Sequence, residues 1–225
     1  MSVFLVSFSG IDGSGKTTLS KILVKELKER GVECKYVYGR LEPIISRPLI
    51  LAGRKIFLRK RDVKKDYKGY SSEKKEVFKK YSSFSRIYYY ILVLDYTLQL
   101  FFKIRLPLLF GKKLICDRYV YDTLVMDLVI DFNLNEYQML RLLNRFFWVV
   151  PRPNVAFLID LDEEIAFHRK SDTPSVDYLR ERREVYLRIA EKERMVILDG
   201  TEDLQKIKGR VLEIIMELVK GRRFK

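Results

Sequence analysis

The chain has 225 residues and a formal net charge of +14, and 48% of its residues are hydrophobic. This composition supports a packed core, excludes a largely disordered chain, and fits a single domain spanning residues 1–225. The excess of lysine and arginine favours an anionic partner, such as a nucleotide, a nucleic acid, a phosphorylated metabolite or a membrane surface.

Short apolar runs alternate along the chain with longer segments whose apolar residues have helical spacing. The short runs predict strands at residues 3–9, 34–39, 114–116, 155–160 and 195–199. The longer segments predict helices at residues 16–30, 75–110, 120–148, 161–170, 176–192 and 203–219. This alternation predicts an α/β protein with a parallel sheet, whose ligands bind beyond the carboxyl ends of the strands.

The segment GIDGSGKT at residues 10–17 fits the pattern G-x-x-x-x-G-K-[ST], and it stands between the first predicted strand and the first predicted helix. Glycines at these positions let the backbone turn tightly and aim its N–H groups at phosphate oxygens, beside the positive end of a helix dipole. The segment therefore predicts a binding loop for ATP, formed by Gly10, Asp12, Gly13, Ser14, Gly15, Lys16, Thr17 and Thr18.

Three side chains of this loop are candidates for a direct role in chemistry. We expect Lys16 to reach the β- and γ-phosphates and the Thr17 hydroxyl to ligate Mg²⁺. Asp12 is a candidate to orient a phosphoryl acceptor or a magnesium-bound water, with an ordinary turn residue as the alternative. The chain has no Asn-Lys-x-Asp segment, which argues against a GTPase.

A second polar cluster, Asp117-Arg118-Tyr119, follows the third predicted strand. An aspartate there can hold Mg²⁺ or a water, and an arginine can grip a phosphate with two hydrogen bonds. We therefore predict Asp117 as a second metal ligand, and all three residues as substrate contacts. The alternative is a local ion pair that only holds the loop in place.

Several segments resemble thymidylate kinases, in the same order along the chain. FSGIDGSGKTT at residues 8–18 resembles that family's F-x-G-x-D-G-x-G-K-T-T loop, and CDRY at 116–119 resembles its Asp-Arg-Tyr motif. Residues 151–169, 177–190 and 197–207 are similar to its proline-led fourth strand, its closing helix and its adenine-side loop. The resemblance implies a nucleoside monophosphate kinase with the three-layer P-loop NTPase fold, in which helices flank a five-stranded parallel sheet.

The resemblance also implies a reaction, in which ATP and Mg²⁺ convert dTMP to dTDP, often in a homodimer. Family members without a basic residue inside the phosphate loop typically supply an arginine from a mobile lid. Residues 168–176 are the lid candidate here, and Arg169 is the expected catalytic arginine beside Lys16, Asp12 and Arg118. A solvated basic helix end is the alternative interpretation of this segment.

The acceptor side departs from the family pattern. The family's Phe-x-x-x-Arg falls on Leu92 and Tyr96, so Tyr96 takes the place of the expected arginine, while Arg86 and the tyrosines at 88–90 lie upstream as alternatives. The family's Arg-Glu-Pro appears as RLEP at residues 40–43, which makes Glu42 a candidate substrate contact. The family's Ser-x-x-Ala-Tyr-Gln is replaced by VYDTLVM at residues 120–126.

Residues 54–80 contain 12 lysines and arginines against 4 acidic residues. This basic insertion is either a solvated segment beside an anionic site or a surface for nucleic acid or lipid headgroups. The apolar stretch at 88–110 is interrupted by charged residues and a proline, so we expect a soluble cytoplasmic protein without membrane insertion. Two cysteines and one histidine fit a reducing cytosol and exclude most histidine-based chemistry.

Three functions remain open on the sequence. The leading one is phosphorylation of a nucleoside monophosphate, with dTMP as the expected acceptor. The second is a kinase of the same fold that acts on another small phosphoryl acceptor. The third is an ATP-binding module that uses the basic insertion to bind nucleic acid or to regulate a partner, although nucleic acid is not the expected partner.

Overall fold

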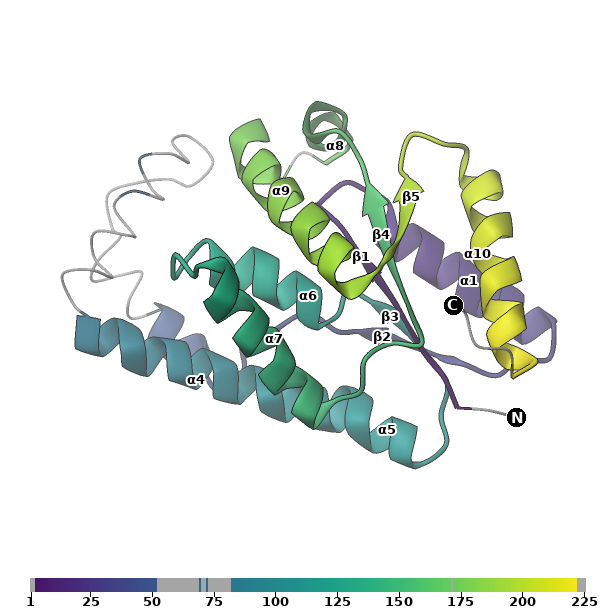
Figure 1. The fold of residues 1–225 in the computed structure, drawn as a ribbon, viewed down its shortest axis with the longest axis horizontal. Helices are drawn as coiled ribbons and strands as arrows, with labels where there is room; N and C mark the ends of the chain where they lie inside the picture. The colour runs from purple at the N-terminus through teal and green to yellow at the C-terminus, as the bar shows by residue number, and fades with distance from the viewer. Residues whose placement is uncertain (1–2, 52–68, 70–71, 73–81, 171, 222–225) are drawn as a thin grey trace.

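A computed structural model describes residues 3–51, 69, 72, 82–170 and 172–221 (Figure 1). Nearly all of the basic insertion at 54–80 lies outside these described residues. None of the helices in the described part of the chain is long and apolar enough to cross a membrane.

The centre of the molecule is a sheet of five parallel strands in the order β2-β3-β1-β4-β5. The strands are β1 Leu5–Ser9, β2 Lys35–Tyr38, β3 Leu114–Asp117, β4 Val155–Asp160 and β5 Val196–Asp199. Every residue of β1 is buried, as expected for a strand covered on both faces. The predicted parallel α/β sheet is confirmed, and so is its number of strands.

Helices cover both faces of the sheet, which makes three layers (Figure 1). One face packs against α1 and α10, and the other face packs against α4, α6, α7 and α9. The helices are α1 Lys16–Glu29, α4 Ser82–Leu100, α5 Leu106–Leu109, α6 Val120–Thr123, α7 Glu136–Val149, α8 Glu163–Arg169, α9 Val176–Glu193 and α10 Leu204–Val219. Two π-helical turns, η1 Phe101–Arg105 and η2 Leu124–Val129, extend α4 and α6.

The prediction of one continuous helix over 120–148 is wrong. The chain forms α6 and η2, leaves helical geometry, and starts α7 at residue 136. Asn133 takes a positive φ of 50°, and the side chain of Asn135 accepts a hydrogen bond from the backbone N–H of Gln138 at 2.9 Å. These two asparagines end one helix and cap the next, while the apolar spacing continues across the break and hides it.

The carboxyl ends of the parallel strands lie along one edge of the sheet. Strand β1 leads there into the phosphate loop, β3 leads into Arg118, and β2 leads into a segment at residues 39–47 that we call the acceptor loop. Segments far apart in the sequence therefore meet at this edge.

Candidate active site

The phosphate loop is held against β4 and α8 by close backbone contacts. A Cβ on Gly10 would lie 2.5 Å from the carbonyl oxygen of Ile159, and a Cβ on Gly13 would lie 2.4 Å from that of Ala166. Both glycines also have positive φ angles, of 141° and 88°. A side chain at either position would therefore force the loop away from its support and change where its N–H groups point.

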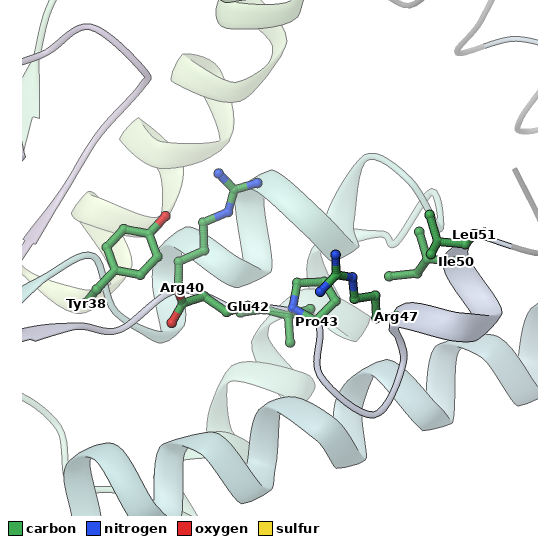
Figure 2. Close-up of a pocket in the computed structure, with 8 residues that line it drawn as sticks. Tyr38, Arg40, Glu42, Pro43, Arg47, Ile50 and Leu51 are labelled. Atoms are coloured by element: carbon green, nitrogen blue, oxygen red, sulfur yellow. The ribbon is translucent and has the colours of Figure 1, made fainter.

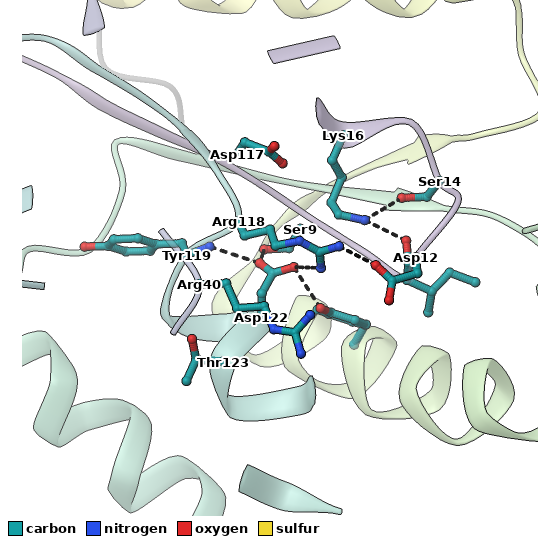
Figure 3. A network of polar contacts seen from close by, with 12 residues as sticks. Ser9, Asp12, Ser14, Lys16, Arg40, Asp117, Arg118, Tyr119, Asp122 and Thr123 are labelled. Atoms are coloured by element: carbon teal, nitrogen blue, oxygen red, sulfur yellow. Dashed lines mark hydrogen bonds and ion pairs between the residues drawn. The ribbon is translucent and has the colours of Figure 1, made fainter. Parts of the chain in front are cut away.

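Lys16 is folded back over this loop (Figure 3). Its ammonium donates to the backbone carbonyl of Ile11 at 2.6 Å and to the hydroxyl of Ser14 at 3.0 Å, and the residue is only 3% exposed. Burial and the nearby Arg118 guanidinium lower the pKa of Lys16 to about 7. A phosphate at the loop would oppose both effects, because its negative charge favours the charged ammonium.

Thr17 and Asp117 meet as the sequence predicted. The Thr17 hydroxyl donates to Oδ2 of Asp117 at 2.6 Å, and the Tyr36 hydroxyl donates to the same oxygen at 2.7 Å. The other oxygen, Oδ1, is buried and accepts no hydrogen bond from the described residues. A buried carboxylate oxygen without a partner is costly, and a hydroxyl with a carboxylate is a donor set that Mg²⁺ accepts. These residues therefore fit a magnesium ion.

Arg118 links the phosphate loop to the end of β3 (Figure 3). Its Nη2 is paired with the carboxylate of Asp12, and its Nη1 lies 3.4 Å from Oδ1 of Asp122. Burial opposes ionisation of Asp12, but Arg118 and Lys16 hold the pKa of that carboxyl well below its usual range. The structure thus brings the predicted groups Asp12, Lys16 and Arg118 into one charged cluster.

Asp122 is a member of this cluster that the sequence analysis missed. It is fully buried and accepts hydrogen bonds from the hydroxyls of Ser9 at 2.7 Å and Tyr186 at 2.8 Å, and from the backbone N–H of Tyr119 at 3.0 Å. Burial raises its pKa, and the nearby Arg118 opposes that rise. The available signal was an acid four residues after Arg118, which is the spacing of an ion pair on a helix.

Two of the predicted substrate contacts lie in the core. Tyr119 is fully buried and its hydroxyl donates to the carbonyl of Pro151 at 2.7 Å. Tyr96 is 1% exposed and its hydroxyl donates to the carbonyl of Gly39 at 2.7 Å. Neither side chain presents a polar atom at the surface, so the structure gives them supporting roles in place of the direct contacts that were predicted.

The acceptor loop and the residues after it line an open pocket of about 620 Å³ (Figure 2). Its lining consists of Tyr38, Arg40, Leu41, Glu42, Pro43, Arg47, Ile50 and Leu51. Arg40 is held by two hydrogen bonds, of 2.7 and 2.9 Å, to the carboxylate of Asp127. The predicted substrate contact Glu42 does line this pocket, and its exposed carboxylate is paired with Lys103.

In the lid candidate, residues 168–176, the cation near the phosphate loop is Lys170 and not the predicted Arg169. Arg169 ends α8 and donates to the carbonyl of Gly200 at 3.2 Å, next to β5. The next residue, Lys170, lies 3.5 Å from the carboxylate of Asp12. In this structure Lys170 therefore reaches the charged cluster, and Arg169 faces the loop after β5.

Comparisons with known proteins agree with this geometry. The family model described as thymidylate kinase matches residues 64–211. A probable thymidylate kinase from Archaeoglobus fulgidus is 27% identical over 226 residues, which is 94% of each chain. A thymidylate kinase from Sulfurihydrogenibium is 29% identical over 97% of this chain and 98% of that protein, and one from Ligilactobacillus salivarius is 27% identical over 93% and 96%.

The match to the family model includes the Asp-Arg-Tyr segment and starts after the phosphate loop, while the three relatives align with 93 to 97% of the chain. They confirm the predicted phosphotransferase and the predicted fold, and they do not favour the alternative of a nucleic-acid-binding module. The chain therefore belongs to the thymidylate kinase family of nucleoside monophosphate kinases.

Proposed function

We propose that this kinase transfers the γ-phosphoryl group of ATP to dTMP, giving ADP and dTDP. The proposal rests on one observation: the guanidinium of Arg118, which follows β3, pairs with the carboxylate of Asp12 in the phosphate loop. A cation able to grip an acceptor phosphate thus lies beside the end of the loop that holds the γ-phosphate. The names of the relatives, thymidylate kinases from bacteria and archaea, support dTMP as that acceptor.

On the donor side, catalysis consists of positioning and charge stabilisation. The backbone N–H groups of the loop hold the phosphates at the N-terminus of α1. Lys16 turns from the carbonyl of Ile11 to the β- and γ-phosphates. Both groups are placed before the reaction begins, so they stabilise the charge that spreads over the transferring group at little reorganisation cost.

Thr17 and Asp117 would hold Mg²⁺, with the partnerless Oδ1 of Asp117 as the buried oxygen that accounts for the fit. Held by these two residues, Mg²⁺ would supply positive charge against the β- and γ-phosphates. Tyr36 keeps the Asp117 carboxylate in one orientation through its hydrogen bond to Oδ2.

On the acceptor side, the guanidinium of Arg118 binds the monophosphate, and Asp122 holds Nη1 of that guanidinium in place. The pocket beside it offers Arg40, Glu42 and Arg47 to the rest of the nucleotide. Lys170 is close enough to Asp12 to follow the transferring phosphate as the lid closes, and Arg169 is the alternative.

A coupled assay of ADP release over a panel of nucleoside monophosphates tests the proposal. We expect turnover with dTMP to exceed that with dUMP, dCMP, dAMP, dGMP and UMP. If only a different monophosphate gives turnover, that monophosphate and not dTMP is the acceptor. ATP binding without acceptor-stimulated turnover, together with salt-sensitive oligonucleotide binding, would reject the kinase in favour of a nucleic-acid module.

We also propose that the kinase is a homodimer that pairs through α4 and α5. One face of these helices exposes a stripe of apolar side chains: Ile87, Leu94, Leu98, Phe102, Leu109 and Phe110. The stripe has helical spacing, and an apolar face on one helix can pair with its own copy around a two-fold axis. Sedimentation velocity should show a dimer that Leu94→Glu weakens, and a monomer at micromolar concentration would contradict the proposal.

A further inference from the structure

The acceptor loop is fastened to α4 by a buried carboxylate. Oδ2 of Asp95 accepts hydrogen bonds from the backbone N–H of Ile44 at 3.0 Å, from the N–H of Ser46 at 2.9 Å, and from the Ser46 hydroxyl at 2.7 Å. Asp95 is 1% exposed and Ser46 is fully buried. Burial alone would raise the pKa of Asp95, but these hydrogen bonds hold it below its usual value, so the group is a buried anion held by its donors.

One turn further along α4, Gln99 forms hydrogen bonds with the backbone of the same loop. Its Nε2 donates to the carbonyl of Glu42 at 2.8 Å and to Oδ1 of Asp95 at 2.9 Å, while its Oε1 accepts from the N–H of Glu42 at 3.2 Å. One turn beyond that, Lys103 pairs with the carboxylate of Glu42. Asp95 and Gln99 of α4 and Lys103 of the adjoining turn η1 stand at i, i+4 and i+8, and we call this row the α4 ladder.

The opposite side of the acceptor loop faces the nucleotide pocket. Glu42 and Arg47 line it, and Arg47 follows directly after the anchored Ser46 (Figure 2). Unlike Arg40, which is held by Asp127, Arg47 has no ion pair with any residue that the structure describes. The ladder thus holds the stretch of backbone that carries Glu42 and Arg47, two residues that line the pocket.

The face of α4 expected to contact the acceptor is closed. Leu92 is 4% exposed and Tyr96 is 1% exposed. Asp95 and Gln99 bond their polar groups to the loop, whereas Arg86 and Tyr90, further upstream on α4, are exposed. This part of α4 therefore acts on a ligand of the pocket through the loop.

We propose that Asp95, Gln99 and Lys103 are positioning residues for the acceptor nucleotide, which is recognised by the loop that they hold instead of by α4 itself. This inference rests on the proposed function, because it takes a nucleoside monophosphate as the ligand of the pocket. It predicts that damage to the ladder weakens acceptor binding and leaves ATP binding intact, since the described contacts of the ladder are with the acceptor loop and not with the phosphate loop.

Asp95→Asn tests the ladder by replacing one carboxylate oxygen of Asp95 with an NH₂ group. If the remaining oxygen keeps the contacts to Ser46 and Ile44, the new amide faces the amide of Gln99, and two donors oppose each other. A flip of Gln99 relieves that conflict but reverses its donor and acceptor against the backbone of Glu42. The loop must therefore move in either case.

The measurement is steady-state kinetics with dTMP varied at saturating ATP, and ATP varied at saturating dTMP. For Asp95→Asn we expect the KM for dTMP to rise roughly 10-fold, which corresponds to the loss of one or two buried hydrogen bonds. The kcat and the KM for ATP should stay within about 2-fold.

Thr97→Val is the matched control on the same helix. The hydroxyl of Thr97 donates within α4, to the carbonyl of Val93 at 2.6 Å, so its described hydrogen bond is not to the acceptor loop. We expect both KM values of this variant to match those of the wild type. An equal change in Thr97→Val would show a general effect of α4, and would overturn the proposal.

Hydrogen exchange provides a readout that does not depend on the acceptor. In Asp95→Asn the amides of Ile44 and Ser46 should exchange faster, while the amides of β1 and α1 should not change. Unchanged exchange in the loop, or a KM for ATP that rises as much as that for dTMP, would overturn the proposal. Absence of dTMP turnover in the wild type would instead reject the proposed function, while loop exchange would still test the ladder.

Discussion

The phosphate loop and the acceptor loop lie at the same edge of the sheet, but the hydrogen bonds that fix their shape span different distances along the chain. Lys16 contacts Ile11 and Ser14, which are five and two positions away. The acceptor loop is instead held by Asp95 and Asp127, which are 49 positions from Ser46 and 87 positions from Arg40. The hydrogen bonds of Lys16 to its own loop are thus local in sequence, whereas the acceptor loop is held by side chains of distant elements.

This difference explains why the donor half follows its family pattern while the acceptor half departs from it. A local loop keeps its shape only if its own residues are kept, because glycine and lysine have no substitutes there. A loop held from elsewhere depends instead on side chains of other elements, as the acceptor loop depends on Asp95 and Gln99 of α4. The following experiments test whether the two halves behave as separate units.

The largest effect should come from Lys16→Ala. The variant loses the cation that stabilises the β- and γ-phosphates, so we expect kcat to fall about 10²- to 10³-fold, with a KM for dTMP within a few-fold of the wild type. The coupled assay of ADP release measures both values. Lys25→Ala, on the exposed face of the same helix, should behave as the wild type. A near-normal kcat in Lys16→Ala would refute the assignment of the phosphate loop.

Asp122→Asn should have the next largest effect, because Arg118 then loses one of its two carboxylate partners. We expect kcat/KM for dTMP to fall about 10²-fold and the free energy of unfolding to fall by about 2 kcal/mol. Tyr186→Phe keeps the charge of Asp122 and removes only one hydrogen bond, so its effect should be much smaller. Equal effects in the two variants would mean that Asp122 stabilises the fold rather than holding Arg118.

The lid residues should show a smaller contrast. Lys170 lies near Asp12, whereas Arg169 contacts the carbonyl of Gly200, so Lys170→Met should lower kcat by about 10-fold and Arg169→Met should mainly raise the KM for ATP. Single-turnover kinetics separate the two effects. A larger loss of kcat in Arg169→Met would restore the arginine predicted from the sequence as the residue that acts on the transferring phosphate.

The smallest effect should be a pH dependence of ADP affinity. The pKa of Lys16 is about 7 without ligand, and a bound phosphate raises it, so binding takes up a proton above pH 7. The affinity should therefore be full below pH 7 and fall about 5-fold from pH 7.5 to 8.5, measured by calorimetry without metal. Lys16→Met should remove this dependence, and an affinity that rises with pH would contradict it.

Much of the donor half could be predicted from the sequence. The pattern at residues 10–17, between a strand and a helix, was enough to place the loop, and Thr17 does meet Asp117 where two parallel strands end. The acceptor half was harder, because Tyr96 stands where a ligand-binding residue was expected and yet points into the core. No spacing rule relates Asp95 to residues 49 to 51 positions earlier in the chain.

The sequence by itself determined the parallel α/β fold and the phosphate loop, because hydrophobic periodicity and short-range backbone geometry are properties of neighbouring residues. Only the tertiary structure decided that Asp122 lies under Arg118, that Lys170 reaches Asp12 ahead of Arg169, and that α4 holds the acceptor loop. These contacts depend on how α4, α6 and α8 pack against the sheet. Packing of that kind depends on the whole core and cannot be predicted from any one segment.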